Sequence, residues 1–531
     1  MHVWNLSARE PGDPRAAGGP WHRRPRREGP SRNPKMNGPR KSDRSVVPEK
    51  PPNKAGRPAA GAVEGRGLAA GNVDQQNVRR TLSRGSTPSA LDRVREAARR
   101  QKGRKFTALL HHVTVERLRA AFEALQPKAA AGVDGVTWEQ YREGLDEKLV
   151  ELHARVHRGA YRARPTRRAY IPKTDGRMRA LGIAAVEDKV VQRAVVEVMN
   201  AVYEEDFLGF SYGFRAGRSQ HHALDALAAG IVHKKVNWVL DADIRGFFDA
   251  IDHGWLMKFI EHRIGDLRVL RLIRKWLNAG VMEKGRWTES EEGTPQGATV
   301  SPLLANIYLH YVLDLWVQQW RKRHARGEVI IMRYADDFIV GFQHRDDAKQ
   351  FRRELAERLV SFGLELHPDK TRLIEFGRYA AERRIAAGVA KPETFDFLGF
   401  THICARRREG GFMLARHTSR RRLCNRLHEI RKEIHSRRHA PIHEQGKWLG
   451  DVLRGYFQYH AVPTNSRALQ NFRCQVERHW LHALRRRGQR DGTNWKRLNT
   501  LSARWLPPPQ VLHPWPDDRF YATTRGKSPV R

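Results

Sequence analysis

Cysteine is scarce in this sequence, and long apolar runs are absent. The 531 residues include three cysteines, Cys404, Cys424 and Cys474, and none of them lies in a C-x-x-C pair. A disulfide framework and a four-cysteine zinc site are therefore disfavoured, and a reducing, cytoplasmic setting is expected. No stretch approaches the roughly 18 apolar residues that a membrane-spanning helix requires, and no signal-peptide core is present. These absences argue against a secreted protein and against a membrane protein.

Acidic residues are also in deficit. Lys and Arg number 98 against 58 Asp and Glu, which gives a formal net charge of +40. An excess of this size predicts a polyanionic partner, and nucleic acid is a simpler one than a membrane surface. The 25 histidines are scattered without an H-E-x-x-H spacing, so we expect them at the surface or facing RNA.

Composition divides the chain into segments. Residues 1–88 are rich in Pro, Gly, Arg and Lys and are predicted to be a disordered basic extension. Residues 89–160 show helical periodicity, and residues 161–400 alternate strand-like with helix-like patterns. Strand signals fade beyond residue 405, and residues 401–505 are predicted to be a basic, all-helical domain. Residues 506–531 contain the three consecutive prolines Pro507, Pro508 and Pro509 and are predicted to be a tail.

Local signals place several elements. Thr137 and Gln140 have capping-box spacing, which predicts a helix start. Residues 238–243 read as a short strand. Ser301 followed by Pro302 predicts the start of a helix that runs through Leu309.

Two neighbouring carboxylates, Asp336 and Asp337, interrupt an apolar, β-prone run at residues 331–342, as at a hairpin tip. A third, Asp243, ends the predicted strand at 238–243. Neighbouring like charges are costly to desolvate unless a cation compensates them, and Mg²⁺ prefers carboxylate oxygens. Three carboxylates at adjacent strand ends would suit two divalent ions and phosphoryl transfer. The alternative is a set of ordinary turn aspartates.

Ordered motifs make the chain resemble a known family. Tyr334-Ala-Asp-Asp337 and Asp241-Ala-Asp-Ile-Arg-Gly-Phe-Phe-Asp249 look like the two metal-binding motifs of reverse transcriptases. Further blocks resemble the group II intron reverse transcriptase/maturase family: Tyr170–Arg179, Ser211–Ser219, Gly293–Asn306, Leu364–Thr371 and Phe395–Phe400. The resemblance covers about residues 91–510.

The resemblance implies an α+β fold, a right-hand polymerase whose fingers and palm carry an antiparallel sheet and helices, followed by an all-helical thumb and maturase domain X. It implies that Asp243, Asp336 and Asp337 are catalytic and hold two Mg²⁺ ions. The carbonyl of Ile244 is implied as a backbone ligand.

The same resemblance assigns the substrate contacts. Lys173 and Arg179 match finger residues that grip the incoming triphosphate, although each could belong to a solvated charge cluster. Phe248 matches the bulky gate that favours dNTPs over rNTPs, or it is a core aromatic. Gln296 matches a residue that contacts the incoming nucleotide and the template. Contacts with template or primer are implied for Arg215, Arg218 and Lys370.

The basic C-terminal region carries a net charge of +15 over residues 401–490, from 21 Lys or Arg and 6 Asp or Glu. Its arginine clusters are interpreted as intron RNA contacts: Arg420, Arg421, Arg422, Arg437, Arg438, Arg485, Arg486 and Arg487. Aromatic residues between the clusters could stack on bases, but for each one we favour helix packing. Residues 453–462 resemble the core of domain X.

Some features depart from the family. Ala180 and Ala216 stand where proline is usual, and Gly297-Ala varies the common Gly-Gly. No cysteine pairs of an H-N-H endonuclease follow domain X, so no endonuclease is expected. Met36 offers a second candidate start of translation.

The sequence thus predicts a cytoplasmic, ribonucleoprotein-associated bacterial RNA-directed DNA polymerase that also acts as a splicing maturase. Its expected partners are group II intron RNA, a DNA target or primer, and dNTPs, with no membrane. Monomer and dimer both remain open. Two alternatives are a splicing-only RNA-binding protein and a reverse transcriptase co-opted, like a retron, for phage defence.

Overall fold

The computed structural model describes residues 90–524, apart from 173–177, 284, 289–292, 295, 390 and 489–491. The predicted disorder of residues 1–88 and the predicted triphosphate contact of Lys173 lie outside the described residues. Within these ranges, no helix is long and apolar enough to cross a membrane.

The described chain opens with four helices, two of which pack on a long central helix. They are α1 (Ala90–Arg100), α2 (Val115–Glu123), α3 (Trp138–Arg142) and α4 (Leu145–His157), with a 3₁₀ turn at Leu110–His112. α1 and α2 contact α5 (Val186–Asp206), whose valine-rich faces are buried. The capping box is confirmed, since Thr137 Oγ1 accepts from Gln140 N and the Gln140 side chain accepts from Thr137 N.

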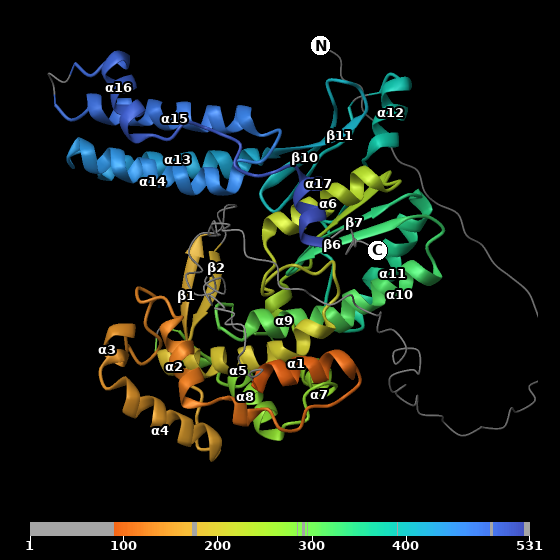
Figure 1. Ribbon diagram of the computed structural model, residues 1–531, viewed down its shortest axis with the longest axis vertical. Helices are drawn as coiled ribbons and strands as arrows, with labels where there is room; N and C mark the ends of the chain where they lie inside the picture. Colours follow the sequence, from red (N-terminus) through yellow and green to blue (C-terminus); the bar gives the residue numbers. More distant parts are fainter. Residues whose placement is uncertain are drawn as a thin grey trace, which may run out of the picture. The chain divides into compact units, whose positions relative to one another are not determined.

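Two sheets build the middle of the chain (Figure 1). The first has the order β2-β1-β4-β5, with strands Met178–Ile183, Thr166–Pro172, Val281–Glu283 and Arg286–Thr288. The second, here called the central sheet, is antiparallel with the order β6-β7-β3-β8. Its strands are Val329–Tyr334, Asp337–Phe342, Trp238–Ala242 and Arg372–Glu375. Helices α6 (Gln220–His233) and α11 (Arg345–Val360) contact its strands, and the sheet residues Val329 to Arg333 are all buried.

Four more helices lie between β3 and β6 along the chain. They are α7 (His253–Glu261), α8 (Leu267–Leu277), α9 (Ser301–Leu309) and α10 (Leu315–Arg323). The predicted helix through Leu309 is confirmed as α9, and a π-helical segment, His310–Asp314, follows it and carries the chain straight into α10. Val300, not Ser301, is the N-cap residue, and Pro302 lies in the first turn as predicted.

The C-terminal part is not helical from residue 401. A small sheet with the order β11-β10-β9 comes first, from strands Phe412–Thr418, Phe400–Arg406 and Phe395–Phe397, preceded by α12 (Arg378–Ala386). The helices start at residue 420: α13 (Arg420–Ser436), α14 (Ile442–His460), α15 (Ser466–Arg485) and α16 (Trp495–Trp505). The all-helical prediction therefore fails for residues 401–418, where a hairpin pairs Phe400 with Thr418.

Hydrophobic side chains form two clusters. A large one links the N-terminal helices, the helices α5 to α11, the central sheet and the small sheet, and a second one fills α13 to α16. The segment predicted to be a tail contains α17 (Pro516–Thr524), which packs on α6 (Figure 1). The last described helix thus returns to the central sheet.

Candidate active site

Neighbouring strands bring two of the three predicted metal ligands to one end of the central sheet. β3 pairs with β7 in an antiparallel register in which Ala242 faces Phe338. Asp243 follows Ala242 and Asp337 precedes Phe338, so the two aspartates lie side by side where the strands meet. Cα atoms of residues facing each other in such a ladder are typically about 4.5–5.5 Å apart. The structure thereby brings Asp243 to the Asp336–Asp337 pair.

Asp336 lies in the turn of the hairpin that joins β6 to β7, as the sequence predicted. Tyr334 pairs with Asp337 across this turn, which leaves Ala335 and Asp336 as its two central residues. Ala335 has φ +58°, a left-handed conformation that is energetically unfavourable for any residue other than glycine. Gly213 packs against the turn so closely that a Cβ there would lie 2.3 Å from Ala335 N. We will refer to Asp243, Asp336 and Asp337 as the strand-end carboxylates.

A cationic side chain already contacts this group. Lys370 Nζ forms an ion pair with Asp243, and both side chains are partly exposed, at 51% and 20%. Lys370, predicted to touch primer or template, therefore lies at the carboxylates. Nearby, Arg372 pairs with Asp241 at 3.3 Å. Burial raises the pKa of Asp241 to about 6 despite Arg372, and the charge of Asp337 adds to the rise.

The backbone at Asp243 and Ile244 contacts the segment that precedes β8. Asp243 O accepts from His367 N at 2.8 Å, and Ile244 forms a bridge with Leu366. Among the described residues, no three His, Cys, Asp or Glu side chains are arranged as a ready-made metal cage. The carboxylates themselves are hard oxygen donors. The ammonium group of Lys370, which pairs with Asp243, shows that a cation fits beside this residue.

One loop links the predicted nucleotide contacts to the strand end. Phe248 O accepts from Thr294 N at 2.8 Å, and Ile251 O accepts from Gly293 N at 2.9 Å. Gln296 O in the same loop accepts from Gly182 N of β2 at 2.7 Å. Phe247 is buried, whereas Phe248 is partly exposed. The loop thus connects the segment after Asp243 with the strand that carries Arg179.

Arg179 is exposed on β2 and pairs in register with Ile171. Gly297 has φ +115°, and a Cβ there would lie 3.0 Å from Gly182 O, so the close approach of loop and strand favours glycine.

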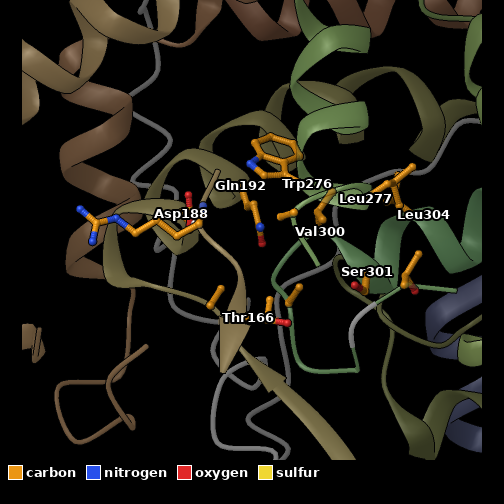
Figure 2. A pocket seen from close by; sticks show the side chains of 13 residues that line it. Thr166, Asp188, Gln192, Trp276, Leu277, Val300, Ser301 and Leu304 are labelled. Carbon is orange, nitrogen blue, oxygen red and sulfur yellow. Dashed lines mark hydrogen bonds between the residues drawn. The ribbon is translucent and has the colours of Figure 1, made fainter. Parts of the chain in front are cut away.

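A pocket behind this loop shows which buried groups support it (Figure 2). Gln192 Oε1, on α5, accepts from Thr299 N at 3.0 Å. Asp188, one turn earlier, accepts from the Tyr161 hydroxyl and from Arg164 N. Burial raises the pKa of Asp188 to about 6. No motif in the sequence identified these supports, because each acts through a backbone atom or a single hydrogen bond.

Of the two arginines predicted to contact the template before α6, Arg215 is buried and Arg218 is partly exposed. The Arg215 side chain is fully buried, pairs with Glu204 at 3.0 Å and donates to Leu208 O and Ser211 O. Its guanidinium would have to leave these partners to reach a phosphate, which argues against a template contact for Arg215. Arg218 donates to Gly209 O and lies over the Tyr212 ring, and burial lowers its pKa to about 10. Both arginines brace the loop before α6.

The C-terminal arginine clusters are more accessible. Arg420, Arg421, Arg437, Arg485 and Arg486 are exposed, and Arg422, Arg438 and Arg487 are partly exposed. The aromatic residues between them mostly pack inside, which confirms the packing interpretation. Tyr456 stacks on Phe472 at 3.6 Å, and Trp480 Nε1 donates to Gln445 at 3.0 Å. The arginines, not most of the aromatics, are the exposed groups of this region.

The expectation that the histidines lie at the surface is wrong for several of them. His221 of α6 is buried and stacks on His513 at 4.0 Å. Beside them Asp225 pairs with Arg416 at 2.8 Å and with Arg519 at 3.1 Å. We call these five residues the buried junction, since they join α6, β11 and α17. Burial lowers the pKa of His221 to about 2 and that of His513 to about 4, while it raises the pKa of Asp225.

Comparisons with known proteins agree with this geometry. Residues 171–402 match the family described as reverse transcriptase (RNA-dependent DNA polymerase). Protein YkfC of Escherichia coli K12 is 35% identical, over 46% of this chain and 71% of that protein. The group II intron-encoded protein LtrA of Lactococcus lactis is 34% identical, over 45% of this chain and 40% of that protein.

A more distant relative is a nuclear intron maturase of Arabidopsis thaliana, 29% identical over 25% of this chain and 18% of that protein. The alignments thus span from under a fifth to about seven tenths of these relatives. The matched residues include both strand-end motifs and the loop that carries Gln296. The chain belongs to the reverse transcriptase family that includes the group II intron-encoded proteins.

Proposed function

We propose that this protein copies RNA into DNA with the strand-end carboxylates and supports group II intron splicing and mobility with its basic C-terminal region. The observation that carries the polymerase half is the β3–β7 register, which sets Asp243 beside Asp337 and the turn with Asp336. The fold around them is interpreted as fingers and palm, with α13 to α16 as thumb and domain X.

The three carboxylates and the Ile244 carbonyl would hold two Mg²⁺ ions. Bound there, the ions would lower the barrier to attack of a primer 3′-hydroxyl on the α-phosphate of a dNTP and would stabilise the leaving pyrophosphate. The protein's own part is positioning, because phosphoryl transfer depends mainly on alignment and electrostatics. The Lys370 ammonium neutralises Asp243 and would leave it when a divalent cation binds.

The nucleotide would lie between β2 and the strand end. Arg179, with Lys173, would hold the triphosphate, since cationic donors suit phosphate oxygens. Phe248 would lie under the sugar and exclude a 2′-hydroxyl. Gln296 would contact the base pair being formed. The hydrogen bond from Gly182 N to the Gln296 carbonyl would fix the position of its backbone.

The proposed maturase activity is supported by the positive charge of the C-terminal helices and by the names of two similar proteins. Exposed arginines at both ends of the C-terminal helices suit phosphates of a structured RNA. One relative is named as a group II intron-encoded protein and another as an intron maturase. The partners would be group II intron RNA, a DNA primer or target, and dNTPs.

Primer extension on an RNA template tests the polymerase half. Asp336→Asn should abolish cDNA synthesis and leave RNA affinity within about twofold, because the carboxylate acts on the reaction and not on RNA docking. Asp451→Asn removes a carboxylate that is 62% exposed on α14 and serves as the matched control, with full activity expected. Synthesis at wild-type rate in Asp336→Asn would refute the proposal.

Splicing and primer-extension assays on the same protein preparation distinguish two rival functions. A splicing-only protein would bind intron RNA and promote splicing but extend no primer in the wild type. A defence reverse transcriptase would extend primers and give no acceleration of intron splicing. Both activities in one chain are the outcome that the proposal requires.

A further inference from the structure

The turn that carries Asp336 rests on a fully buried ion pair. Arg333, two residues before Ala335, and Asp314 both have side chains with 0% exposure, and their closest atoms are 2.6 Å apart. Arg333 Nε donates to Asp314 Oδ1 and Nη2 donates to Oδ2, so the guanidinium grips the carboxylate with a two-pronged fork.

All five donors of this guanidinium are used. Besides the fork, Nη1 donates to Asn306 Oδ1 at 2.9 Å and to Ala335 O at 3.0 Å, and Nη2 donates to Ser211 Oγ at 2.7 Å. An arginine has five N–H donors and a lysine three, so only arginine completes this set. The bond to Ala335 O acts directly on the residue with φ +58°.

The same group of residues holds the turn from its other side. Asn306 Nδ2 donates to Gly213 O at 2.8 Å, and Gly213 packs on Ala335 N. Ser211 bridges to Arg333 along the backbone, with Tyr212 N donating to Arg333 O at 2.8 Å. Ala335 is therefore clamped between a side-chain donor and a neighbouring backbone, and its strained conformation persists because both sides define it.

Asp314 owes its place to the π-helical segment. It is the last residue of His310–Asp314, where the chain departs from the ordinary helical register between α9 and α10. Such segments add a residue to a turn and are frequent at functional sites. Here the last residue of the segment is the counter-ion of the guanidinium beneath the turn.

We propose that Arg333 is a positioning residue, which with Asp314 fixes the left-handed turn at Ala335 and so sets the place of the Asp336 carboxylate for its cation. The inference rests on the proposed function, because it gives Asp336 a cation to hold. Arg333 itself touches no substrate.

The test is direct Mn²⁺ binding to the full chain without RNA, primer or nucleotide, measured by the loss of the free-Mn²⁺ EPR signal. Arg333→Lys keeps the charge and loses the fork, so Mn²⁺ affinity should fall about tenfold. Arg263→Lys is the matched control, since Arg263 is equally buried and pairs with Asp206 at 2.7 Å in another part of the fold. It should lower the melting temperature comparably and leave Mn²⁺ affinity within twofold.

Primer extension adds a second readout that general destabilisation would not produce. Arg333→Lys should lower kcat about a hundredfold with KM for dNTP within threefold, because Arg179 and Gln296 lie on other elements. If Arg333→Lys does not fold, Ser211→Ala removes one acceptor and should weaken Mn²⁺ binding about threefold.

The outcomes separate the two proposals. Unchanged Mn²⁺ affinity in Arg333→Lys, or in Ser211→Ala where it replaces it, overturns the positioning role, as does an equal loss in Arg263→Lys. If the wild type shows no Mn²⁺ site that Asp336→Asn removes, the proposed function itself fails and the positioning role falls with it.

Discussion

The strand-end carboxylates and the buried junction solve the same electrostatic problem in opposite ways. At the strand end, Asp243 is compensated by a flexible lysine that is half exposed to solvent. At the junction, Asp225 is compensated by Arg416 and Arg519, and the Asp225 and Arg416 side chains are each 2% exposed. A solvated lysine can be exchanged for another cation at little cost, whereas a buried arginine cannot leave without stranding a charge. The first arrangement suits a site that works on ligands, and the second suits a permanent joint.

The turn beneath Asp336 combines the two arrangements. Its outer face carries the carboxylate, and its inner face rests on the sealed pair of Arg333 and Asp314. Carboxylates whose cation can be exchanged are thus held in place by a buried ion pair whose members cannot be exchanged. The comparison can be tested by removing one member from each arrangement.

Asp243→Asn should give the largest effect, on rate and not on stability. Losing one of the carboxylates proposed to hold a cation should lower kcat for primer extension at least a thousandfold, or about 4 kcal/mol in activation free energy. The free energy of unfolding should change by less than about 0.5 kcal/mol, as for most partly exposed sites. A large loss of stability with little loss of activity would reverse the comparison.

Asp225→Asn should do the opposite. It leaves two buried guanidinium groups without their counter-charge, so urea denaturation should show a loss of about 3–5 kcal/mol in unfolding free energy. Activity per folded molecule should stay within about threefold of the wild type. Asp451→Asn again serves as the exposed control, with no measurable loss expected.

Acid should weaken the junction. His221 and His513 have lowered pKa values in the fold, about 2 and 4, because burial favours their neutral forms. Their contribution is therefore complete above the unfolded pKa of about 6.5 and is lost as the pH falls below it, by about 2 kcal/mol per histidine at pH 5. His221→Phe keeps an aromatic ring in the stack and should reduce the pH 7 to pH 5 loss in unfolding free energy by that amount. An unchanged pH dependence would show that His221 is not the group that titrates.

Lys370→Met should give only a small change in stability, because it removes the same ion pair as Asp243→Asn. The pair with Asp243 is partly exposed, so its removal should cost less than about 1 kcal/mol in the same urea experiment. A loss as large as that of Asp225→Asn would mean that the two aspartates are held alike, and the contrast would not stand.

The sequence was most informative where chemistry and strand pattern coincide. The apolar run broken by Asp336 and Asp337 predicted a hairpin tip, and the short strand before Asp243 predicted its partner; both strands formed, next to each other. The fate of Arg215 could not be read in this way, because a basic residue in a turn looks the same whether it meets solvent or Glu204.

The supports of the site were also hidden from the sequence. Asp314 lies beyond the helix predicted through Leu309, in the π-helical segment, and nothing in the sequence around it indicates its pairing with Arg333. The return of α17 to α6 depends on Asp517 and Arg519, two ordinary charges in a proline-rich stretch. Pairings between distant segments follow from the tertiary fold and leave no periodic pattern along the chain.

The return of α17 has a consequence for how the protein is made. His233 of α6 and its partner Asp517 are separated by 284 positions. At typical synthesis rates of about 5–20 residues per second, a ribosome needs about 15–60 s to travel from one to the other. Throughout that interval the nascent chain carries Asp225 without Arg519, and the joint that ties α6 to the last helix closes only after all the basic helices have emerged.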